Sequence, residues 1–169
     1  MQALHAMEVT HPGESHRYFF TLITHRRQRV LTRSSVRSTL FDIMRTVGEE
    51  LPFEIDAWVL MPDHLHCIWT VPIEMPDCSE RWNLITQRSS RQLQRSELEF
   101  WERRYWQHRL VSEADYQQHR DYIHYNPVRH GLVEHVADWR YSSFHYLVQR
   151  GEYAKDWRPE REFEGSYGE

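Results

Sequence analysis

The sequence predicts a single α+β domain built on a mainly antiparallel four-stranded β-sheet with helices packed on one face. Runs rich in β-branched and aromatic residues alternate with stretches whose apolar residues recur every three or four positions. Their order along the chain is strand, helix, strand, strand, helix, strand, helix, which favours an α+β architecture. The 169 residues suffice for one hydrophobic core and contain no internal repeat and no low-complexity tract.

Three strands and one helix are predicted in the first half of the chain. The strands cover residues 17–24, 53–60 and 64–71, and the short link 61–63 joins the last two into a hairpin. Between the first two strands, residues 31–50 have the pattern of an amphipathic helix. Its apolar positions are Val36, Leu40, Ile43, Met44 and Val47.

The second half is predicted to be mainly helical. The elements are a helix over 79–98, a strand over 105–110, an irregular stretch over 134–139 and a short helix over 143–149. A further helix begins after Ser112, whose hydroxyl can cap it, and acidic residues in its first turn suit the positive end of the helix dipole. We expect this helix to end near Asn126, because Pro127 cannot continue a helix interior and disfavours helical angles before it.

Charge and composition divide the chain into three parts. Residues 16–150 form the predicted domain, preceded by a loose arm over 1–15 and followed by an acidic tail over 151–169. The tail has six acidic and three basic residues and accounts for −3 of the net charge of −4. We expect the tail to be extended or partly disordered. The remainder of the chain is close to neutral, so the overall acidity does not exclude a nucleic-acid partner.

Several broad classes are excluded by composition. No apolar run approaches the roughly 20 residues of a transmembrane helix, and the N-terminus lacks the apolar core of a signal peptide. Two cysteines, Cys67 and Cys78, do not make a disulfide framework. The expectation is a reduced protein of the cytoplasm with no membrane partner.

Two histidines in the strand 64–71 are candidate metal ligands. Side chains two apart on a strand point to the same face, so His64 and His66 face together and Cys67 faces away. Neutral imidazoles are common ligands of divalent metal ions. The chain has 12 histidines, and two on a half-buried strand could equally be structural.

A tyrosine and an asparagine share one face of the helix that precedes Pro127. Tyr122 and Asn126 are four residues apart, which places their Cβ atoms roughly 5–6 Å from one another. The face therefore offers a phenol beside an amide oxygen, although a core tyrosine and a helix-end asparagine would give the same pattern. Tyr125 is an alternative nucleophile, but it lacks the four-residue relation to Asn126.

Taken together, these two stretches resemble a known signature. His64-Leu65-His66, followed by Tyr122-Ile123-His124-Tyr125-Asn126-Pro127-Val128, is similar to the motifs of the single-tyrosine HUH transposases. The similarity is strongest to the REP-associated tyrosine transposases, a domesticated bacterial branch, and spans roughly residues 15–150. It implies a ferredoxin-like sheet, with the active site where the histidine strand meets the tyrosine helix.

The resemblance also implies a chemistry. Tyr122 would attack a DNA phosphodiester to give a 5′-phosphotyrosine and a free 3′-OH, so that strand transfer needs no ATP. His64, His66 and Asn126 would hold a divalent metal ion, Mg²⁺ or Mn²⁺. Asp63 stands where the wider family commonly has Asn, and we expect it to face away from His64 and not to be a ligand. His124 is interpreted as structural.

Arginine and aromatic residues supply candidate DNA contacts. Arginine suits phosphates and guanine edges, and aromatic rings can stack on unpaired bases. The chain contains a single lysine, Lys155, so arginine carries nearly all its basic charge. The candidates are Arg17, Arg26, Arg27, Arg29, Arg88, Arg91, Arg95, Arg104, Trp106 and His108. A basic stripe formed by Arg81, Arg88, Arg91 and Arg95 could equally be a solvated helix face.

The implied substrates are single-stranded hairpins of repetitive extragenic palindromes (REPs), which would place the protein at the nucleoid. A monomer is favoured over a homodimer, because the acidic tail could cover a sheet edge used for pairing. Two other functions stay open: a DNA-hairpin binding protein without cleavage, and a structural RNA-binding domain. The latter fits the sheet but lacks the Gly-aromatic strand signature of the commonest RNA-binding fold.

Overall fold

A four-stranded antiparallel sheet forms the centre of the protein, as seen in a computed structural model that describes residues 14–93, 100–160, 162–163 and 165–169. The strands are β1 (Ser15–Ile23), β2 (Glu54–Leu60), β3 (His64–Pro72) and β4 (Trp106–Leu110). They lie in the order β2-β3-β1-β4, and every neighbouring pair is antiparallel. This order confirms the predicted ferredoxin-like α+β fold. The predicted arm over 1–15 lies almost entirely outside the described residues.

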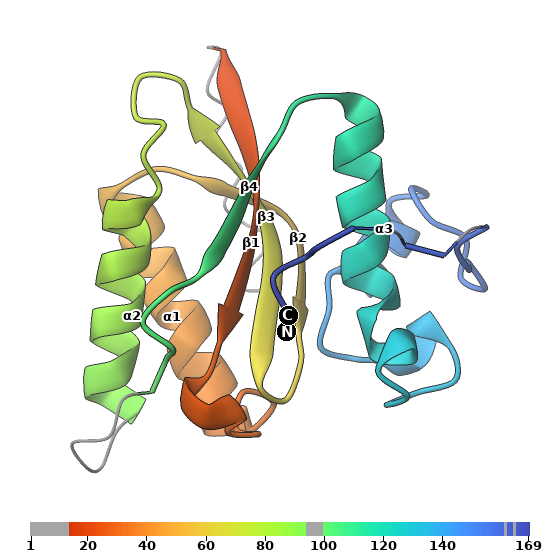
Figure 1. The fold of residues 1–169 in the computed structure, drawn as a ribbon, viewed down its shortest axis with the longest axis horizontal. Coiled ribbons are helices and arrows are strands. Elements are labelled where there is room, and N and C mark those ends of the chain that lie inside the picture. The colour runs from red at the N-terminus through yellow and green to blue at the C-terminus, as the bar shows by residue number, and fades with distance from the viewer. Residues whose placement is uncertain (1–13, 94–99, 161, 164) are drawn as a thin grey trace.

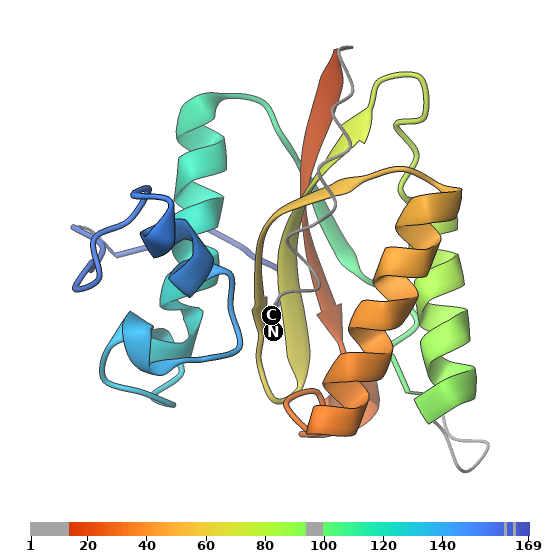
Figure 2. The ribbon, with the colours of Figure 1, turned by 180° about the vertical axis from the view of Figure 1, so that it is seen from behind.

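The helices cover both faces of the sheet, so the prediction that they pack on one face was wrong. Helices α1 (Ser34–Glu50) and α2 (Ser79–Leu93) lie side by side on one face, and α3 (Glu113–Arg129) lies on the other (Figures 1 and 2). The short helix α4 (Phe144–Gln149) packs beyond α3. The physical reason is that β1 and β3 are buried on both sides, and a strand with two apolar faces needs cover on each.

The face under α1 and α2 is an aromatic core. Trp69 of β3 stacks on Trp82 of α2 with ring centroids 4.0 Å apart, and Phe53 stacks on the opposite side of Trp69 at 4.0 Å. Phe20 of β1 completes the cluster with an edge contact to Trp82. Cys67 is buried in this core, as the alternation of β3 predicts. Burying each large aromatic side chain contributes roughly 1.5–3 kcal/mol.

One arginine of the proposed basic stripe belongs to this core and not to a solvated face. The guanidinium of Arg81 is buried and donates to the carbonyls of Leu51, Pro52 and Asp77, at 3.3, 2.9 and 2.7 Å. It therefore ties the first turn of α2 to the chain that follows α1. The predicted helix over 79–98 is confirmed as far as Leu93, and residues 94–99 lie outside the described part of the chain.

Helix α3 begins where the sequence predicted and ends later. The Ser112 hydroxyl accepts from the backbone N–H of Asp115 at 3.1 Å, which is the expected cap. The helix then runs through Pro127 to Arg129, so the prediction of an end near Asn126 was wrong. Pro127 removes one backbone bond, but it is buried, and His130 N–H still closes the last turn on Asn126 O at 3.0 Å.

The acidic tail packs against the domain, whereas we expected an extended or partly disordered segment. Its described residues form no helix or strand, yet Tyr153 and Tyr167 are buried. The last residues return to the face of the sheet that α3 covers, where they lie between β3 and α3 (Figure 1). They cover a face of the sheet, not an edge. No helix in the described part of the chain is long and apolar enough to cross a membrane.

Candidate active site

The two strand histidines face α3 and point at a common position. Their Nε2 atoms lie 3.5 Å (His64) and 2.8 Å (His66) from one carboxylate oxygen, Oε1 of Glu169. The two rings are 4.8 Å apart and inclined at 76°, so the ring planes converge. The sequence prediction that both side chains share a face is therefore confirmed. Both are almost completely buried.

Neighbouring polar groups fix the orientation of each imidazole. Thr21, the cross-strand partner of His66 on β1, places its Oγ1 2.7 Å from His66 Nδ1 and donates its own hydrogen to the Tyr167 carbonyl. Asp63 Oδ1 lies 2.7 Å from His64 Nδ1. Such outer hydrogen bonds hold a ligating histidine in one tautomer and direct Nε2 towards the site.

The contact between Asp63 Oδ1 and His64 Nδ1 overturns the expectation that Asp63 faces away from His64. Asp63 precedes the first residue of β3, so the alternation of the strand does not apply to it. Arg27, in the short 3₁₀ turn His25–Arg27, pairs with the same carboxylate at 3.6 Å. Asp63 remains outside the convergent ligand set, as predicted, but it supports one member of that set.

Burial and charge set the protonation of the two histidines differently. Burial lowers the pKa of His66 to about 4, so its imidazole is neutral near pH 7. Burial alone would lower the pKa of His64 as well, but the carboxylates of Asp63 and Glu169 raise it above its ordinary value. Removing Glu169 would relieve part of that effect.

Helix α3 presents Tyr122 and Asn126 on one face, as their four-residue spacing predicted, and this face meets the histidines, as the resemblance implied. Asn126 Oδ1 lies 3.3 Å from His64 Nε2, and its Nδ2 donates to Glu169 Oε1 at 2.6 Å. The Tyr122 hydroxyl donates to the same Oε1 at 2.5 Å and accepts from Arg129 at 2.7 Å. One oxygen atom is thus contacted by two imidazoles, an amide and a phenol.

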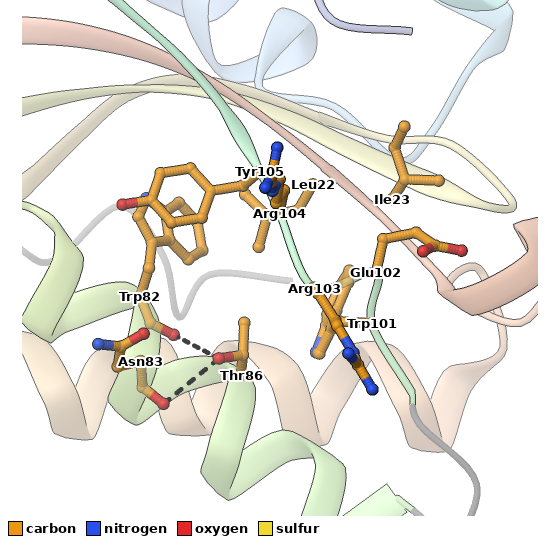
Figure 3. Close-up of a pocket in the computed structure, with 10 residues that line it drawn as sticks. All are labelled: Leu22, Ile23, Trp82, Asn83, Thr86, Trp101, Glu102, Arg103, Arg104 and Tyr105. Carbon is orange, nitrogen blue, oxygen red and sulfur yellow. Dashed lines mark hydrogen bonds between the residues drawn. The ribbon is translucent and has the colours of Figure 1, made fainter.

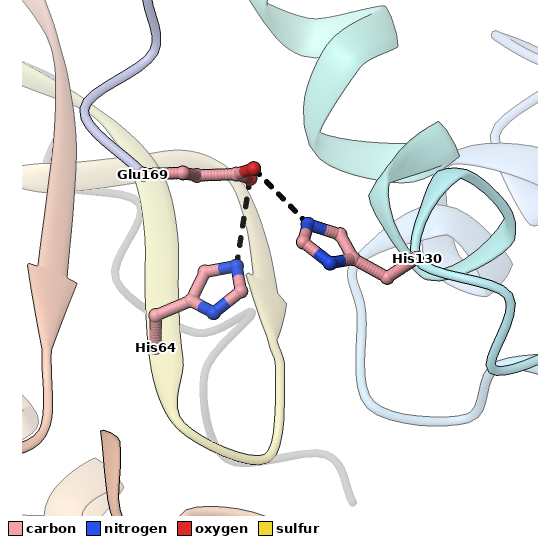
Figure 4. Close-up of side chains that lie close together, drawn as sticks. All are labelled: His64, His130 and Glu169. Atoms are coloured by element: carbon pink, nitrogen blue, oxygen red, sulfur yellow. Dashed lines mark hydrogen bonds and ion pairs between the residues drawn. The ribbon is translucent and has the colours of Figure 1, made fainter. Parts of the chain in front are cut away.

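The tail closes this site. Tyr167 stacks face to face on Tyr122 with ring centroids 3.6 Å apart, which leaves Tyr122 1% exposed. Gly168, at φ +77°, lies so close to Trp106 that a Cβ there would collide with the indole. Figure 4 shows the Glu169 carboxylate between the imidazoles of His64 and His130. Glu169 was not predicted as part of the site.

The tail carboxylate changes the electrostatics of the phenol. Burial raises the pKa of Tyr122 well above its ordinary value, and the hydrogen bond to Glu169 raises it further, while Arg129 acts in the opposite direction. Burial alone would raise the pKa of Glu169, yet its contacts with His64 and His66 hold the pKa far below its usual range. Glu169 is therefore ionised, and with the tail in place Tyr122 is a neutral donor.

Two other side chains of α3, those of His124 and Tyr125, lie away from the histidine pair. His124 is fully buried on the far side of α3, 3.0 Å from the Ser143 hydroxyl, which agrees with its structural interpretation. Tyr125 is half-buried and packs against Phe163, away from the histidines. Of the two tyrosines, only Tyr122 reaches the position where His64 and His66 converge.

The candidate DNA contacts are spread over the molecule. Arg17 pairs with Asp56 at 3.6 Å and Glu113 at 3.2 Å, and Arg26, Arg27 and Arg29 are exposed beyond the end of β1. Arg88 forms a two-pronged ion pair with Glu50, and Arg91 is exposed on the same helix. Arg95 lies outside the described residues. Their role in DNA binding stays a prediction.

Arg104 lies with the α1/α2 layer, on the opposite side of the sheet from Tyr122. It lines a small cavity of about 60 Å³, which the aromatic side chains of Trp82 and Tyr105 also border (Figure 3). Arg104, Arg88 and Arg91 are therefore separated from the candidate nucleophile by the sheet. If they contact DNA, they contact a part of it that is remote from the reacting phosphate.

Trp106 and His108 lie on the Tyr122 side, and His108 belongs to a second polar cluster. Trp106 has an edge contact with Phe19 and stacks on His108. Asp115 accepts from His108 and His119 at 3.0 Å each. The two imidazoles are stacked only 17° from parallel, so their lone pairs lie in nearly parallel planes that do not meet at one ion. This geometry suits a carboxylate shared by two histidines better than a metal centre.

The geometry of the site agrees with what comparison with known proteins shows. Residues 14–126 match the family described as "Transposase IS200 like". A REP-associated tyrosine transposase of Escherichia coli (strain K12) is 40% identical over 83% of each chain. A Haemophilus influenzae protein named in the same way is 34% identical over 83% of this chain and 86% of its own. The chain therefore belongs to the IS200-like transposases, in the branch of REP-associated tyrosine transposases.

Solved structures give the same result. A structure of the REP-associated tyrosine transposase bound to a REP hairpin superposes with a TM-score of 0.83 at 38% identity, over 91% of both chains. A Deinococcus radiodurans protein described as a transposase is 23% identical, with a TM-score of 0.50 over 65% of this chain and 89% of its own, and supports the fold alone. The family membership expected from the motifs is confirmed. Dependence on a metal ion is general in this family.

Proposed function

We propose that this protein cleaves and rejoins single-stranded DNA at REP-type hairpins through a 5′-phosphotyrosine on Tyr122. The main support for this proposal is that four side chains converge on one oxygen atom of Glu169. They are His64, His66, Asn126 and Tyr122. That oxygen stands in for the negatively charged atoms of a substrate. A nucleophile and three side chains of the metal-ligand type thus contact one common anion position.

The donor set fits a divalent metal ion. His64 Nε2 and His66 Nε2 converge on Glu169 Oε1, and the Asn126 amide lies beside them with Oδ1 3.3 Å from His64 Nε2. The imidazole planes are steeply inclined, and Thr21 and Asp63 support the distal ring nitrogens. Two nitrogens and an amide oxygen suit Mn²⁺ or Mg²⁺, Mn²⁺ by ligand softness and Mg²⁺ by abundance. When bound, the ion would act as a Lewis acid on the scissile phosphate.

The residues of the chain perform the rest of the reaction. Tyr122 Oη forms a bond to phosphorus while the bond from phosphorus to the 3′ oxygen breaks, so the number of ester bonds to phosphorus is conserved. The phenolic proton passes to solvent, and the departing 3′ oxygen takes up a proton to become the free 3′-OH. Rejoining reverses these steps with a 3′-OH as the attacking group. Helix α3 holds Tyr122 rigidly for in-line attack.

The substrate proposal rests on the relatives. Proteins 34–40% identical to this chain are named for REP sequences, and the similar solved structure holds a REP hairpin. We extend that substrate class to this chain and place the enzyme at the nucleoid in the cytoplasm. Recognition would combine hairpin shape, base stacking and phosphate contacts. We also propose that it acts as a monomer, because the whole site is assembled from a single chain.

One observation favours a second function, hairpin binding without cleavage. The tail covers Tyr122 and occupies the position of the reacting groups. In this state DNA could bind elsewhere on the surface but could not react. The two functions differ in one product, since a covalent protein–DNA adduct forms only in the first.

The test is adduct formation on a labelled single-stranded REP hairpin from the same genome. Wild type and Glu169→Ala are incubated with Mn²⁺, Mg²⁺ or EDTA and separated under denaturing conditions. We expect a metal-dependent adduct that is faster in Glu169→Ala and is absent in Tyr122→Phe. Tyr125→Phe, three residues along the same helix, is the matched control and should react normally. Tight hairpin binding with no adduct in either Tyr122-containing protein would favour the binding function.

A further inference from the structure

The two oxygens of the Glu169 carboxylate have different surroundings. Oε1 is contacted by the proposed metal ligands and by Tyr122. Oε2 is contacted by two other side chains, Arg129 at 2.9 Å and His130 at 3.0 Å. Neither has a part in the chemistry described above, and a guanidinium cannot ligate a metal ion. The site therefore contains a second anion position, which is lined by a guanidinium and an imidazole.

We propose that Arg129 and His130 form an anion subsite for a non-bridging oxygen of the scissile phosphate, which brings phosphorus within reach of Tyr122. The inference rests on the proposed function and adds two residues to it. The tail carboxylate occupies this subsite in the structure, and a phosphodiester anion would replace it. Arg129 is the central residue, because the same Nη1 atom contacts Tyr122 Oη at 2.7 Å and Glu169 Oε2 at 2.9 Å.

The position of Arg129 follows from the continuation of α3 through Pro127. Arg129 lies seven residues after Tyr122, two helical turns further on the same face. Its guanidinium carbon is 5.3 Å from the centre of the Tyr122 ring, so it lies alongside the phenol. His130 follows as the C-cap residue, and its ring is 5.4 Å from that of His64. The subsite thus adjoins both the nucleophile and the histidine pair.

Two properties make the pair suitable for a phosphate. Arginine stays charged at every relevant pH and presents several donors in one plane, a good match for phosphate oxygens. The side chains of Arg129 and His130 are 46% and 36% exposed, so a strand entering from solvent can reach them. A preorganised donor of this kind stabilises charge that accumulates on the phosphate oxygens as Tyr122 attacks.

A simpler role for the pair must be separated from this one. Arg129 and His130 could serve only to hold the tail, in which case their loss would release Glu169 and expose Tyr122. When Glu169 is present, loss of the pair would raise the rate of adduct formation if the pair only holds the tail. The same loss would lower the rate if the pair binds the phosphate. The comparison is therefore made in the Glu169→Ala background, where the carboxylate that the pair would hold is gone.

The experiment measures the single-turnover rate of adduct formation by Glu169→Ala with and without Arg129→Gln. Removing one preorganised donor is expected to slow the reaction by about 10²–10³-fold. Arg129→Lys should restore part of the rate, and His130→Gln should cost about tenfold. Arg45→Gln, on α1 at the far side of the sheet, is the matched control and should leave the rate unchanged. An unchanged or faster reaction with Arg129→Gln would show that the pair only holds the tail.

A substrate with a neutral methylphosphonate at the scissile position tests the contact itself. This group lacks the charged non-bridging oxygen, so Arg129 has little to stabilise. The ratio of the rates with and without Arg129→Gln should fall from about 10²–10³ to below about fivefold. An equally large ratio on both substrates would overturn the assignment, because Arg129 would then act on something other than phosphate charge.

A binding measurement separates failure of the subsite from failure of the proposed function. If Glu169→Ala forms no adduct at all, the proposed cleavage fails, but hairpin affinity can still be measured in EDTA over a range of salt concentrations. Loss of one phosphate contact should reduce the slope of log affinity against log salt by about 0.7 in Arg129→Gln. An unchanged slope would overturn the subsite as well.

Discussion

The two faces of the β-sheet differ in chemistry although the same strands form both. On the face under α1 and α2, β3 presents Cys67 and Trp69 to a core of stacked rings. On the opposite face the intervening residues of β3 include His64 and His66, which meet α3 and the tail. The buried histidines of the described chain, His64, His66, His119 and His124, all lie against α3 or on it.

This difference shows how a small domain can combine a reactive site with adequate stability. Burial of polar groups costs free energy unless each finds a partner, and a site of histidine, tyrosine and asparagine accumulates such groups. The face under α1 and α2 compensates by extensive burial of apolar and aromatic side chains, and its buried Arg81 is paired with backbone carbonyls. Strand alternation separates the two tasks residue by residue, so changes on one face should affect stability and changes on the other should affect reaction.

The largest expected effect tests the aromatic core under α1 and α2. Trp82→Ala removes a fully buried indole that stacks on Trp69 and should lower the free energy of unfolding by about 3–5 kcal/mol, measured by urea denaturation. The adduct rate of the folded fraction should remain that of wild type. The half-buried Trp157, on the α4 side, is the control, and Trp157→Ala should cost less. Equal losses for the two variants would mean that stability is not concentrated under α1 and α2.

A smaller effect, dependent on pH, tests the α3 side. Burial lowers the pKa of His124 to about 3, whereas an unfolded histidine titrates near 6.5. Between these two pH values the unfolded state binds the proton and the folded state does not. The contribution of His124 to the free energy of unfolding is therefore fully present above pH 6.5 and is lost progressively as the pH falls. The loss is at most about 1.4 kcal/mol per pH unit.

Urea denaturation between pH 7 and 5 measures this slope. His124→Gln should flatten it, whereas His145→Gln, an exposed histidine of α4, should leave it as in wild type. The remaining slope would come from His66 and His119, whose pKa values are also lowered by burial. An unchanged slope in His124→Gln would mean that acid sensitivity does not originate in this helix.

The smallest effect sharpens the comparison at the tail. Gly168→Ala places a Cβ against Trp106 at a positive φ. We expect the tail to open several-fold more often, because the free energy that favours the closed tail falls by about 1 kcal/mol. Gly165→Ala, also at a positive φ but with no atom within 4 Å of its Cβ, is the matched control. Limited proteolysis of the tail reports the opening. Equal cleavage of both variants would mean that the approach to Trp106 does not hold the tail in place.

Much of the fold was predictable because its signals are local. Alternation in 64–71 and the turn before it indicated β3, and the Ser112 cap marked the start of α3 within one residue. The covering of both faces was missed, since one strand's pattern shows that residues are buried but not what buries them. The extension of α3 was missed because the local cost of Pro127 is offset by its burial, which only packing supplies.

The sequence by itself determined the chemical content of the site: a pair of histidines on one strand face, and a tyrosine four residues before an asparagine on one helix face. These relations depend on the fixed periods of strand and helix and need no long-range information. The periods of strand and helix do not say that the two faces meet, which only the resemblance implied. The tertiary structure alone decided that Glu169 returns across 103 residues of chain to His66 and that Arg129 lies beside Tyr122. The physical reason is that such contacts depend on packing between distant segments, and no periodicity of the chain encodes which segments will meet.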